Sequence, residues 1–315
     1  MPTRSWCSKA RGRIQAAGTV EAFTMTARST MIFALLLTMA QAQTVLQPAD
    51  GPARLRAGQA IEAQLLVDSI SVAVPAMRLQ LLSAGLETAG ASLTEGTRAK
   101  HNLTALLTAN PPAALEPEAV RQSLRMAAFE LADDLLFSPV QEAQMPAGFP
   151  GFLAIDEVEL RTYPAYRMVK TNMQGGQMGA FWPLFRHIEE HGIAMTTPVQ
   201  TDWQEAVEGK GERAASMAFL YGDKALGKLG QDGKVEVVDV TGLTVLSIGA
   251  RGGDTTNKVK ALRLVLLACL QEHPEWAAAG PVRTMGYNSP SVMGDRRYFE
   301  VQLPVRIVEK KKLSQ

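Results

Sequence analysis

The chain has 315 residues, of which 46% are hydrophobic and 20% charged, and its 32 Lys and Arg nearly balance its 31 Asp and Glu. This composition is typical of a globular protein with one or two cored domains and excludes a disordered chain. Without a basic excess, we expect no nucleic-acid partner. The two cysteines, Cys7 and Cys269, are too few for a four-cysteine zinc site or a disulfide framework.

Residues 1–42 have the pattern of a secretory signal peptide. A basic residue precedes the apolar run 32–37, and the small residues Ala40 and Ala42 follow it at the spacing that a signal peptidase accepts. The run is too short for a stable membrane span, and the alternative to a signal is a buried helix of the fold. We therefore expect a periplasmic or secreted protein, with a downstream methionine such as Met31 as an alternative true start.

Residues 52–137 are predicted to be helical, because alanine and leucine dominate them and strand-forming aromatic residues are almost absent. The run Glu116-Pro117-Glu118 places a proline and acids where a helix begins. Behind it, an apolar stripe recurs at helical spacing: Val120, Leu124, Ala127, Leu131 and Leu135. We assign no chemistry to this region. The proline and glycine content of residues 138–151 predicts a linker.

From residue 158 the pattern changes, and one order of elements occurs twice. Each unit reads as a strand, a glycine turn, a helix and two further strands. The first unit comprises residues 158–171, 177–190, 193–203 and 214–221, and the second comprises 235–249, 255–270, 281–287 and 297–307. Two such βαββ units can pair their sheet edges. We therefore predict an α+β fold, a distorted β-barrel of two βαββ repeats with two flanking helices, preceded by the helical region and followed by a basic tail at 308–315.

Three segments in these units carry a family resemblance. They read Val158-Glu-Leu-Arg-Thr-Tyr-Pro-Ala-Tyr166, Ile193-Ala-Met-Thr-Thr-Pro-Val199 and Gly286-Tyr-Asn-Ser-Pro290. In this order and spacing, they resemble the SOUL haem-binding protein family over residues 152–307. The resemblance implies a distorted β-barrel of two similar halves, and a protein that binds haem or a related tetrapyrrole without a known catalytic reaction. We accordingly expect a binding protein and not an enzyme.

A tetrapyrrole needs an apolar platform with a cation at its rim for the propionates. Met178 lies on the helix 177–190, where the alternative is a core position. Trp182 and Arg186 are four residues apart and share one flank of that helix. Aligned on its proline, this helix is similar to the ligand-contacting helix of the family, which implies contacts from Trp182, Arg186 and His187. Tyr287 has either a structural role or a ligand contact, and completes the candidate haem-binding set.

One position departs from the family. Some members have a histidine, proposed as an iron ligand, immediately before the tyrosine of the first motif, and this chain has Thr162 there. The iron ligand of those members is therefore absent. Haem is then held by apolar contacts alone or by another ligand such as His187.

The segment His187-Ile-Glu-Glu190-His191 also fits an inverted zinc-protease motif. Two histidines four residues apart on a helix can share a metal ion, but the sequence indicates no third ligand. A solvated helix end is the simpler interpretation, so we predict no metal site and no catalytic residue. A metal hydrolase that uses His187, Glu190 and His191 is one alternative function, and a binding module for another apolar effector is the other. The sequence predicts no oligomeric state.

Overall fold

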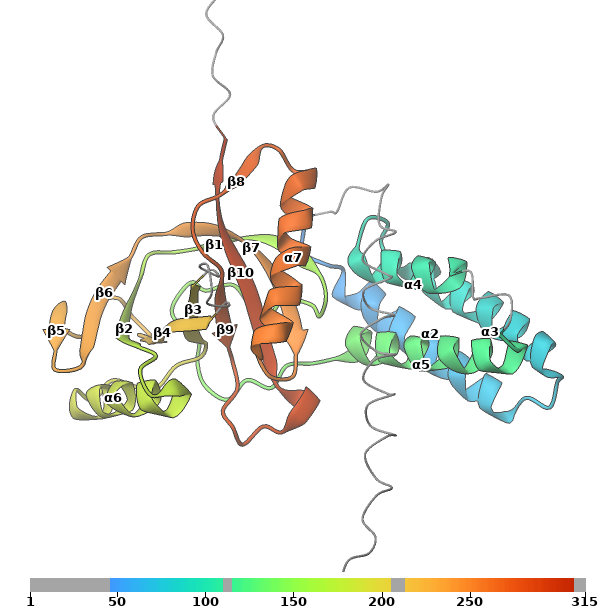
Figure 1. Ribbon diagram of the computed structural model, residues 1–315, viewed down its shortest axis with the longest axis horizontal. Helices are drawn as coiled ribbons and strands as arrows, with labels where there is room; N and C mark the ends of the chain where they lie inside the picture. Colours follow the sequence, from blue (N-terminus) through green and yellow to red (C-terminus); the bar gives the residue numbers. More distant parts are fainter. Residues whose placement is uncertain (1–45, 110–114, 205–212, 309–315) are drawn as a thin grey trace, which may run out of the picture. The chain divides into compact units, whose positions relative to one another are not determined.

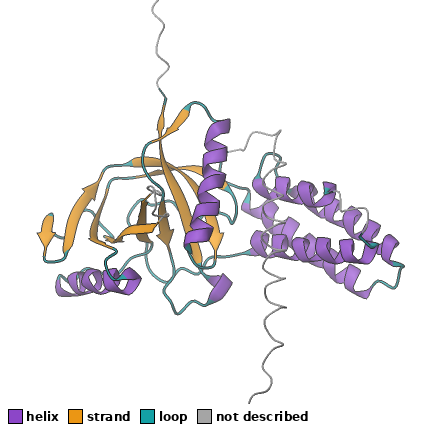
Figure 2. Ribbon diagram, viewed as in Figure 1, coloured by secondary structure: helices purple, strands orange, loops and turns teal. Residues whose placement is uncertain are grey.

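A computed structural model of the chain describes residues 46–109, 115–204 and 213–308. The predicted signal peptide over 1–42 lies outside these residues, as does the basic tail beyond residue 308. Figure 2 shows helices and an antiparallel sheet in the described part, which confirms the predicted α+β class. No helix in these three ranges has both the length and the apolar character needed to cross a membrane.

Four helices form the first part of the described chain (Figure 1). They are α2 (Gly51–Ile70), α3 (Pro75–Ala89), α4 (Arg98–Thr108) and α5 (Pro117–Leu136), with a short 3-10 turn at Gly90–Ser92. Their apolar stripes meet in one core, in which Ile61, Leu82, Leu86 and Ala128 are completely buried. Proline lies in the first turn of α2, α3 and α5, where its missing N–H costs no helical hydrogen bond.

The rest of the described chain builds one ten-stranded sheet and two more helices. The helices are α6 (Gly176–Glu190) and α7 (Thr256–Glu272), and a 3-10 turn lies at Gly294–Arg296. The strands are β1 (Val158–Tyr163), β2 (Tyr166–Asn172), β3 (Val199–Gln204), β4 (Arg213–Leu220), β5 (Gly230–Asp232), β6 (Val235–Val240), β7 (Leu243–Arg251), β8 (Trp276–Ala278), β9 (Arg283–Gly286) and β10 (Tyr298–Ile307). The order along the sheet is β1-β7-β10-β9-β3-β4-β2-β6-β5, with β8 beside β10. The short strands β5 and β8 have no counterpart in the sequence prediction.

The predicted first strand of each unit is broken in its middle. Tyr163 faces Leu243 at the end of the β1·β7 pair, and Tyr166 faces Val240 at the start of β2·β6, so the two pairs continue one another in register. Pro164 lies in the gap between β1 and β2, and proline has no N–H to donate to a ladder. The hydrogen-bonded path among the described strands runs from β1 to β5 without returning on itself. The pairing therefore leaves the sheet open, where we had predicted a barrel.

The two helices of this part each bury one face against the sheet (Figure 1). Helix α6 packs Ala180, Leu184 and Ile188 against apolar residues of β2, β4 and β6. Helix α7 packs Val259 and Leu266 against β7 and β10. Each helix thus keeps one face away from the sheet core, and on α6 that face carries residues of the candidate site.

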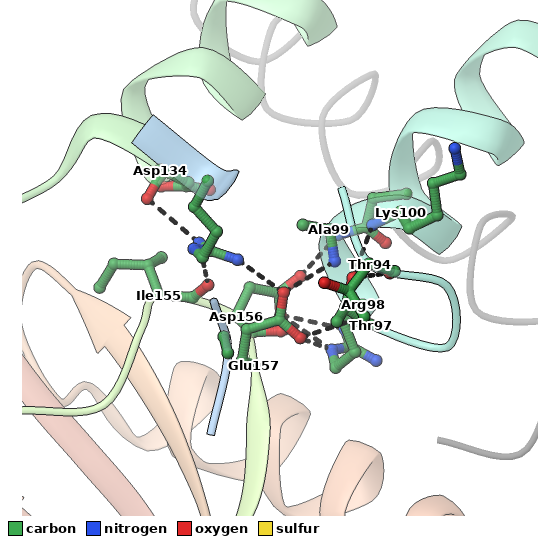
Figure 3. Close-up of polar contacts among 12 residues, drawn as sticks. Thr94, Thr97, Arg98, Ala99, Lys100, Asp134, Ile155, Asp156 and Glu157 are labelled. Carbon is green, nitrogen blue, oxygen red and sulfur yellow. Dashed lines mark hydrogen bonds and ion pairs between the residues drawn. The ribbon is translucent and has the colours of Figure 1, made fainter. Parts of the chain in front are cut away.

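The helical part is joined to the sheet through a buried carboxylate just before β1 (Figure 3). Glu157 Oε1 lies 2.6 Å from a guanidinium nitrogen of Arg54 on α2. The same carboxylate accepts hydrogen bonds from the backbone N–H groups of Arg98 at 2.8 Å and Ala99 at 3.0 Å, which open α4. A carboxylate at a helix N-terminus satisfies N–H groups that lack helical partners. Burial raises the pKa of Glu157, and Arg54 acts against that rise.

Asp156 extends the same junction. Its carboxylate binds the Arg98 guanidinium at 3.0 Å and the Asn102 side chain at 2.6 Å, both on α4. Its N–H donates to the carbonyl of Gly249 on β7 at 2.8 Å. A side chain at Gly249 would meet the carbonyl oxygen of Ala154 at 2.8 Å, so only glycine lets this segment approach β7. Residues 154–157 thus attach the helical part directly to the sheet.

We expect Glu157→Gln to lower the free energy of unfolding by about 3 kcal/mol, because it leaves the buried Arg54 guanidinium without a counter-charge. Chemical denaturation measures this change. Glu236→Gln is the control, since Glu236 pairs with Lys170 and both side chains are more than a third exposed; its effect should stay below about 1 kcal/mol. Equal effects of the two substitutions would contradict the role given to Glu157.

Candidate functional site

The outer side of α6 presents apolar side chains to solvent. Met178 is 58% exposed and Trp182 is 48% exposed, although both are large hydrophobic residues. The half-buried rings of Phe181 and Phe185 lie beside them and contact the core beneath the helix. Most large apolar side chains of a helix on a sheet turn inward, so an outward pair four residues apart forms a small apolar surface.

The aromatic rings of this surface are packed on one another. Phe181 and Phe185 stack with ring centroids 5.7 Å apart, and the Trp182 ring meets Phe185 edge-on at 6.0 Å. Phe181 in turn contacts the buried Phe219 of β4 at 5.3 Å. These contacts hold the exposed indole on a layer of rings anchored in the core. A flat apolar ligand would therefore meet a pre-ordered surface.

Arg186 is exposed one helical turn after Trp182, as the spacing predicts. It has no salt bridge among the described residues. Its charge is permanent, and its planar fork matches a carboxylate. The structure thus brings together three of the predicted site residues, Met178, Trp182 and Arg186, on the solvent side of α6.

His187 lies on another side of the helix and is only 6% exposed. Its Nδ1 is 2.7 Å from a carboxylate oxygen of Asp232, and its Nε2 is 2.8 Å from the hydroxyl of Tyr221. Both ring nitrogens therefore have partners in the fold. A bond from His187 to haem iron would break one of these contacts, and the predicted solvated helix end is wrong for this residue.

Tyr287 lies apart from α6, in a buried cluster with Ile155, Met285 and Tyr298. Its hydroxyl donates to Glu300 on β10 at 3.1 Å. Burial, and then the charge of Glu300, raise the pKa of Tyr287 well above its ordinary value. The hydroxyl is therefore a fixed donor to a buried carboxylate, an arrangement that gives it a structural role.

Glu300 is completely buried, and its two oxygens collect donors from several strands. The donors and their distances are Arg161 at 2.8 Å, Ser247 at 2.9 Å, Gln302 at 2.9 Å, Tyr298 at 3.0 Å, Tyr287 at 3.1 Å and Tyr163 at 3.3 Å. The network continues from Gln302 through Arg283 at 3.0 Å to Tyr166 at 2.8 Å. Side chains from both units thus fill this interior with polar groups that are hydrogen-bonded to one another, apart from the Nη2 atom of Arg283, which is buried without a partner among the described residues.

Thr162, which stands at the family's histidine position, is exposed and borders a depression of about 410 Å³. The depression is lined by Thr162, Tyr163, Gly242, Leu243, Thr244, Ala279, Pro304 and Val305. Its volume suits a small ligand. None of these residues carries a charge at neutral pH, so the depression offers no cation for propionates.

Sequence reasoning missed Glu300 and Asp232. Glu300 stands between Phe299 and Val301 in a strand. Such alternation of apolar and polar residues predicts that one face of the strand is exposed to solvent, whereas both faces of β10 are buried. Asp232 precedes Gly233, and Asp-Gly is a signal for a tight hairpin turn. That signal could have placed Asp232 at a hairpin tip, but not beside α6.

The comparisons with known proteins agree with the motifs. Residues 151–304 match the family model described as SOUL heme-binding protein. The resemblance predicted from the three motifs is therefore confirmed over these residues. Haem as the possible ligand is consistent with this family. No curated protein matches the chain.

Solved structures show weaker likeness. The C-terminal domain of EcmrR is 11% identical, with a TM-score of 0.38 over 48% of this chain and 98% of that one. SAV2435 bound to tetraphenylphosphonium is 11% identical, with a TM-score of 0.30 over 48% of this chain and 94% of that one. A hydrolase from Listeria innocua is 10% identical, with a TM-score of 0.34 over 48% of this chain and 93% of that one. These scores are too low to assign a function.

We expect Tyr287→Phe to lower the free energy of unfolding by about 1.5 kcal/mol, because a hydrogen bond to a buried charge is lost. The affinity for hemin should not change, since Tyr287 lies outside the α6 surface. Denaturant unfolding and a Soret titration of the same variant measure the two effects. Weaker hemin binding with unchanged stability would place Tyr287 in the ligand site instead.

Proposed function

We propose that the domain binds haem or a related tetrapyrrole against the outer side of α6, without catalysis. The observation that carries this proposal is the exposure of Met178 and Trp182 on a layer of packed rings, with Arg186 one turn away. The apolar residues would take the face of the macrocycle. Arg186 would pair with a propionate, which is a carboxylate.

The candidate residues are better suited to contact with the macrocycle than to coordination of its iron. Thr162 replaces the family's histidine, and both nitrogens of His187 are engaged. We therefore propose that apolar contact and charge pairing hold the ring. Bound haem iron supplies ligand-exchange and redox chemistry, and none of the α6 surface residues named here is required to take part in it.

The interior of the sheet is a less suitable place for the ring. Glu300 already has a cation, Arg161, at 2.8 Å, and its other donors surround it. A large apolar ring there would leave buried polar groups unpaired, which costs about 1–3 kcal/mol for each group. We infer that these paired polar groups direct an apolar ligand to the outer surface of the domain.

A hemin titration tests the surface directly. Trp182→Ala and Met178→Ala should each weaken binding about 10-fold, because covering one such side chain contributes about 1.5 kcal/mol. Leu264→Ala is the matched control, since Leu264 is 47% exposed on the other flanking helix, α7. Unchanged affinity in both α6 variants would exclude this surface. No saturable Soret shift at all would favour the binding of a different apolar effector.

Arg186→Ala should weaken hemin binding by more than about 5-fold, the equivalent of the roughly 1 kcal/mol of an exposed ion pair. The loss should shrink in high salt because screening weakens the charge pairing. Lys260→Ala, an exposed cation on α7, is the control. A loss in Arg186→Ala that is independent of salt would contradict propionate pairing.

We also propose that the protein is exported to the periplasm or secreted, on the strength of the signal pattern in residues 1–42. N-terminal sequencing of the native mature protein should give a start near Gln43, after the small residues at the end of the pattern. A native protein that keeps residues 1–42 would contradict export.

A further inference from the structure

A group of potential metal ligands lies at the C-terminal end of α6, away from its exposed apolar side. His187 and His191 are one turn apart on the helix, and Asp232 is the last residue of β5. One ligand atom from each of the three lies within 4.8 Å of the others. Figure 1 shows how this comes about, because α6 runs beneath the β5–β6 hairpin. Glu190, which the sequence motif had included, is not a member of this group.

The three side chains converge on one point. Asp232 Oδ2 is 2.7 Å from His187 Nδ1 and 3.8 Å from His191 Nε2. The two imidazole rings lie 4.3 Å apart, with their planes inclined by 33°. A cation between the three side chains would replace the direct His187–Asp232 contact. It would be coordinated by one nitrogen of each imidazole and by one oxygen of the carboxylate.

The outer hydrogen bonds already orient both rings for such a cation. His191 Nδ1 is 2.8 Å from the carbonyl oxygen of His187, which can only accept, so Nδ1 carries the proton and Nε2 has the lone pair. His187 Nε2 is 2.8 Å from the buried Tyr221 hydroxyl. This hydroxyl can accept a hydrogen bond from the Nε2–H group when Nδ1 binds a metal. Metal-ligating histidines commonly donate their second N–H to an oxygen in this manner.

The ligand set selects the class of metal. Two imidazoles and one carboxylate suit Zn²⁺ and other first-row transition ions, whereas Ca²⁺ and Mg²⁺ prefer oxygen ligands. The side chains of His191 and Asp232 are 46% and 50% exposed, so solvent can enter and fill the remaining coordination position. From this geometry, we propose that His187, His191 and Asp232 bind one Zn²⁺-like ion.

This site has a structural consequence. All three residues of β5 are exposed, and β5 is an edge strand that pairs only with β6 among the described strands. A bound ion would replace the direct His187–Asp232 contact and would hold this thinly packed hairpin to α6 through three ligands. Because the ion does not contact Met178 or Trp182, the proposal stands independently of tetrapyrrole binding.

Competition titration of the full-length chain, free of any histidine tag, against a chromogenic zinc chelator tests the site. We expect one Zn²⁺ per chain, and Co²⁺ should give the intense visible bands of a four-coordinate ion. Loss of one ligand in His191→Ala or Asp232→Asn should weaken Zn²⁺ binding by about 100-fold or more, because loss of an outer hydrogen bond alone costs about 10–100-fold. Tyr221→Phe should fall in that smaller range.

These two ligand variants carry the test because both side chains are about half exposed and lie outside the apolar core. His101→Ala, a histidine of α4 outside the group, is the matched control and should bind Zn²⁺ as the unaltered chain does. Unchanged affinity in both His191→Ala and Asp232→Asn, or a stoichiometry well below one, would overturn the proposal. Hemin titration of the same two variants should give the affinity of the unaltered chain, and a parallel loss would show that the histidines serve the tetrapyrrole instead.

Discussion

A single buried carboxylate organises the interior of the sheet. Glu300 lies in β10, with Arg161 on β1 as its counter-charge. Strands β1, β7 and β10 supply donors to it, as does Tyr287 directly after β9. A buried charge with one partner removed costs several kcal/mol, so each of these strands must hold its register for the pair to survive. The hydroxyl of Tyr287 is one of these donors. This explains why Tyr287, a residue of the third family motif, is directed inward and not toward a ligand.

The filled interior supports the proposal that an apolar ligand binds on an outer surface of the domain. Helix α6 is suited to this since its inner face is saturated by the core, while its outer face keeps Trp182 and Met178 in solvent. Exposed apolar patches on globular proteins commonly mark binding sites. The depression beside Thr162 is lined by no charged residue, so it lacks the cation that the propionates of a tetrapyrrole need.

Local patterns in the sequence predicted most helices and strands, but they did not predict whether the sheet closes into a barrel. Helices and strands follow from periodicity, and the three motifs identified the family. The open path of the sheet did not follow, because it depends on how the ladder passes the gap at Pro164, a non-local property. The segment 138–151 was predicted to be a linker from its composition. In the structure, its Glu142 accepts from the Ser289 N–H at 2.6 Å, so proline content alone did not show that the segment is held against the domain.

The candidate site shows the same limit at the scale of one helix. Spacing alone predicted that Trp182 and Arg186 share a flank. The side on which His187 lies is explained by the same geometry, because five residues turn a helix by about 140°. The spacing of residues along α6 does not show which side of the helix contacts another helix or strand. His187 and His191 form a second pair four residues apart. The third ligand of the proposed site is Asp232, which is 41 residues further along the chain than His191. The register of β5 on β6 and the packing of α6 beneath them bring that carboxylate to the pair. A chemical site on α6 therefore comes from tertiary contacts acting on a pattern that the sequence already held.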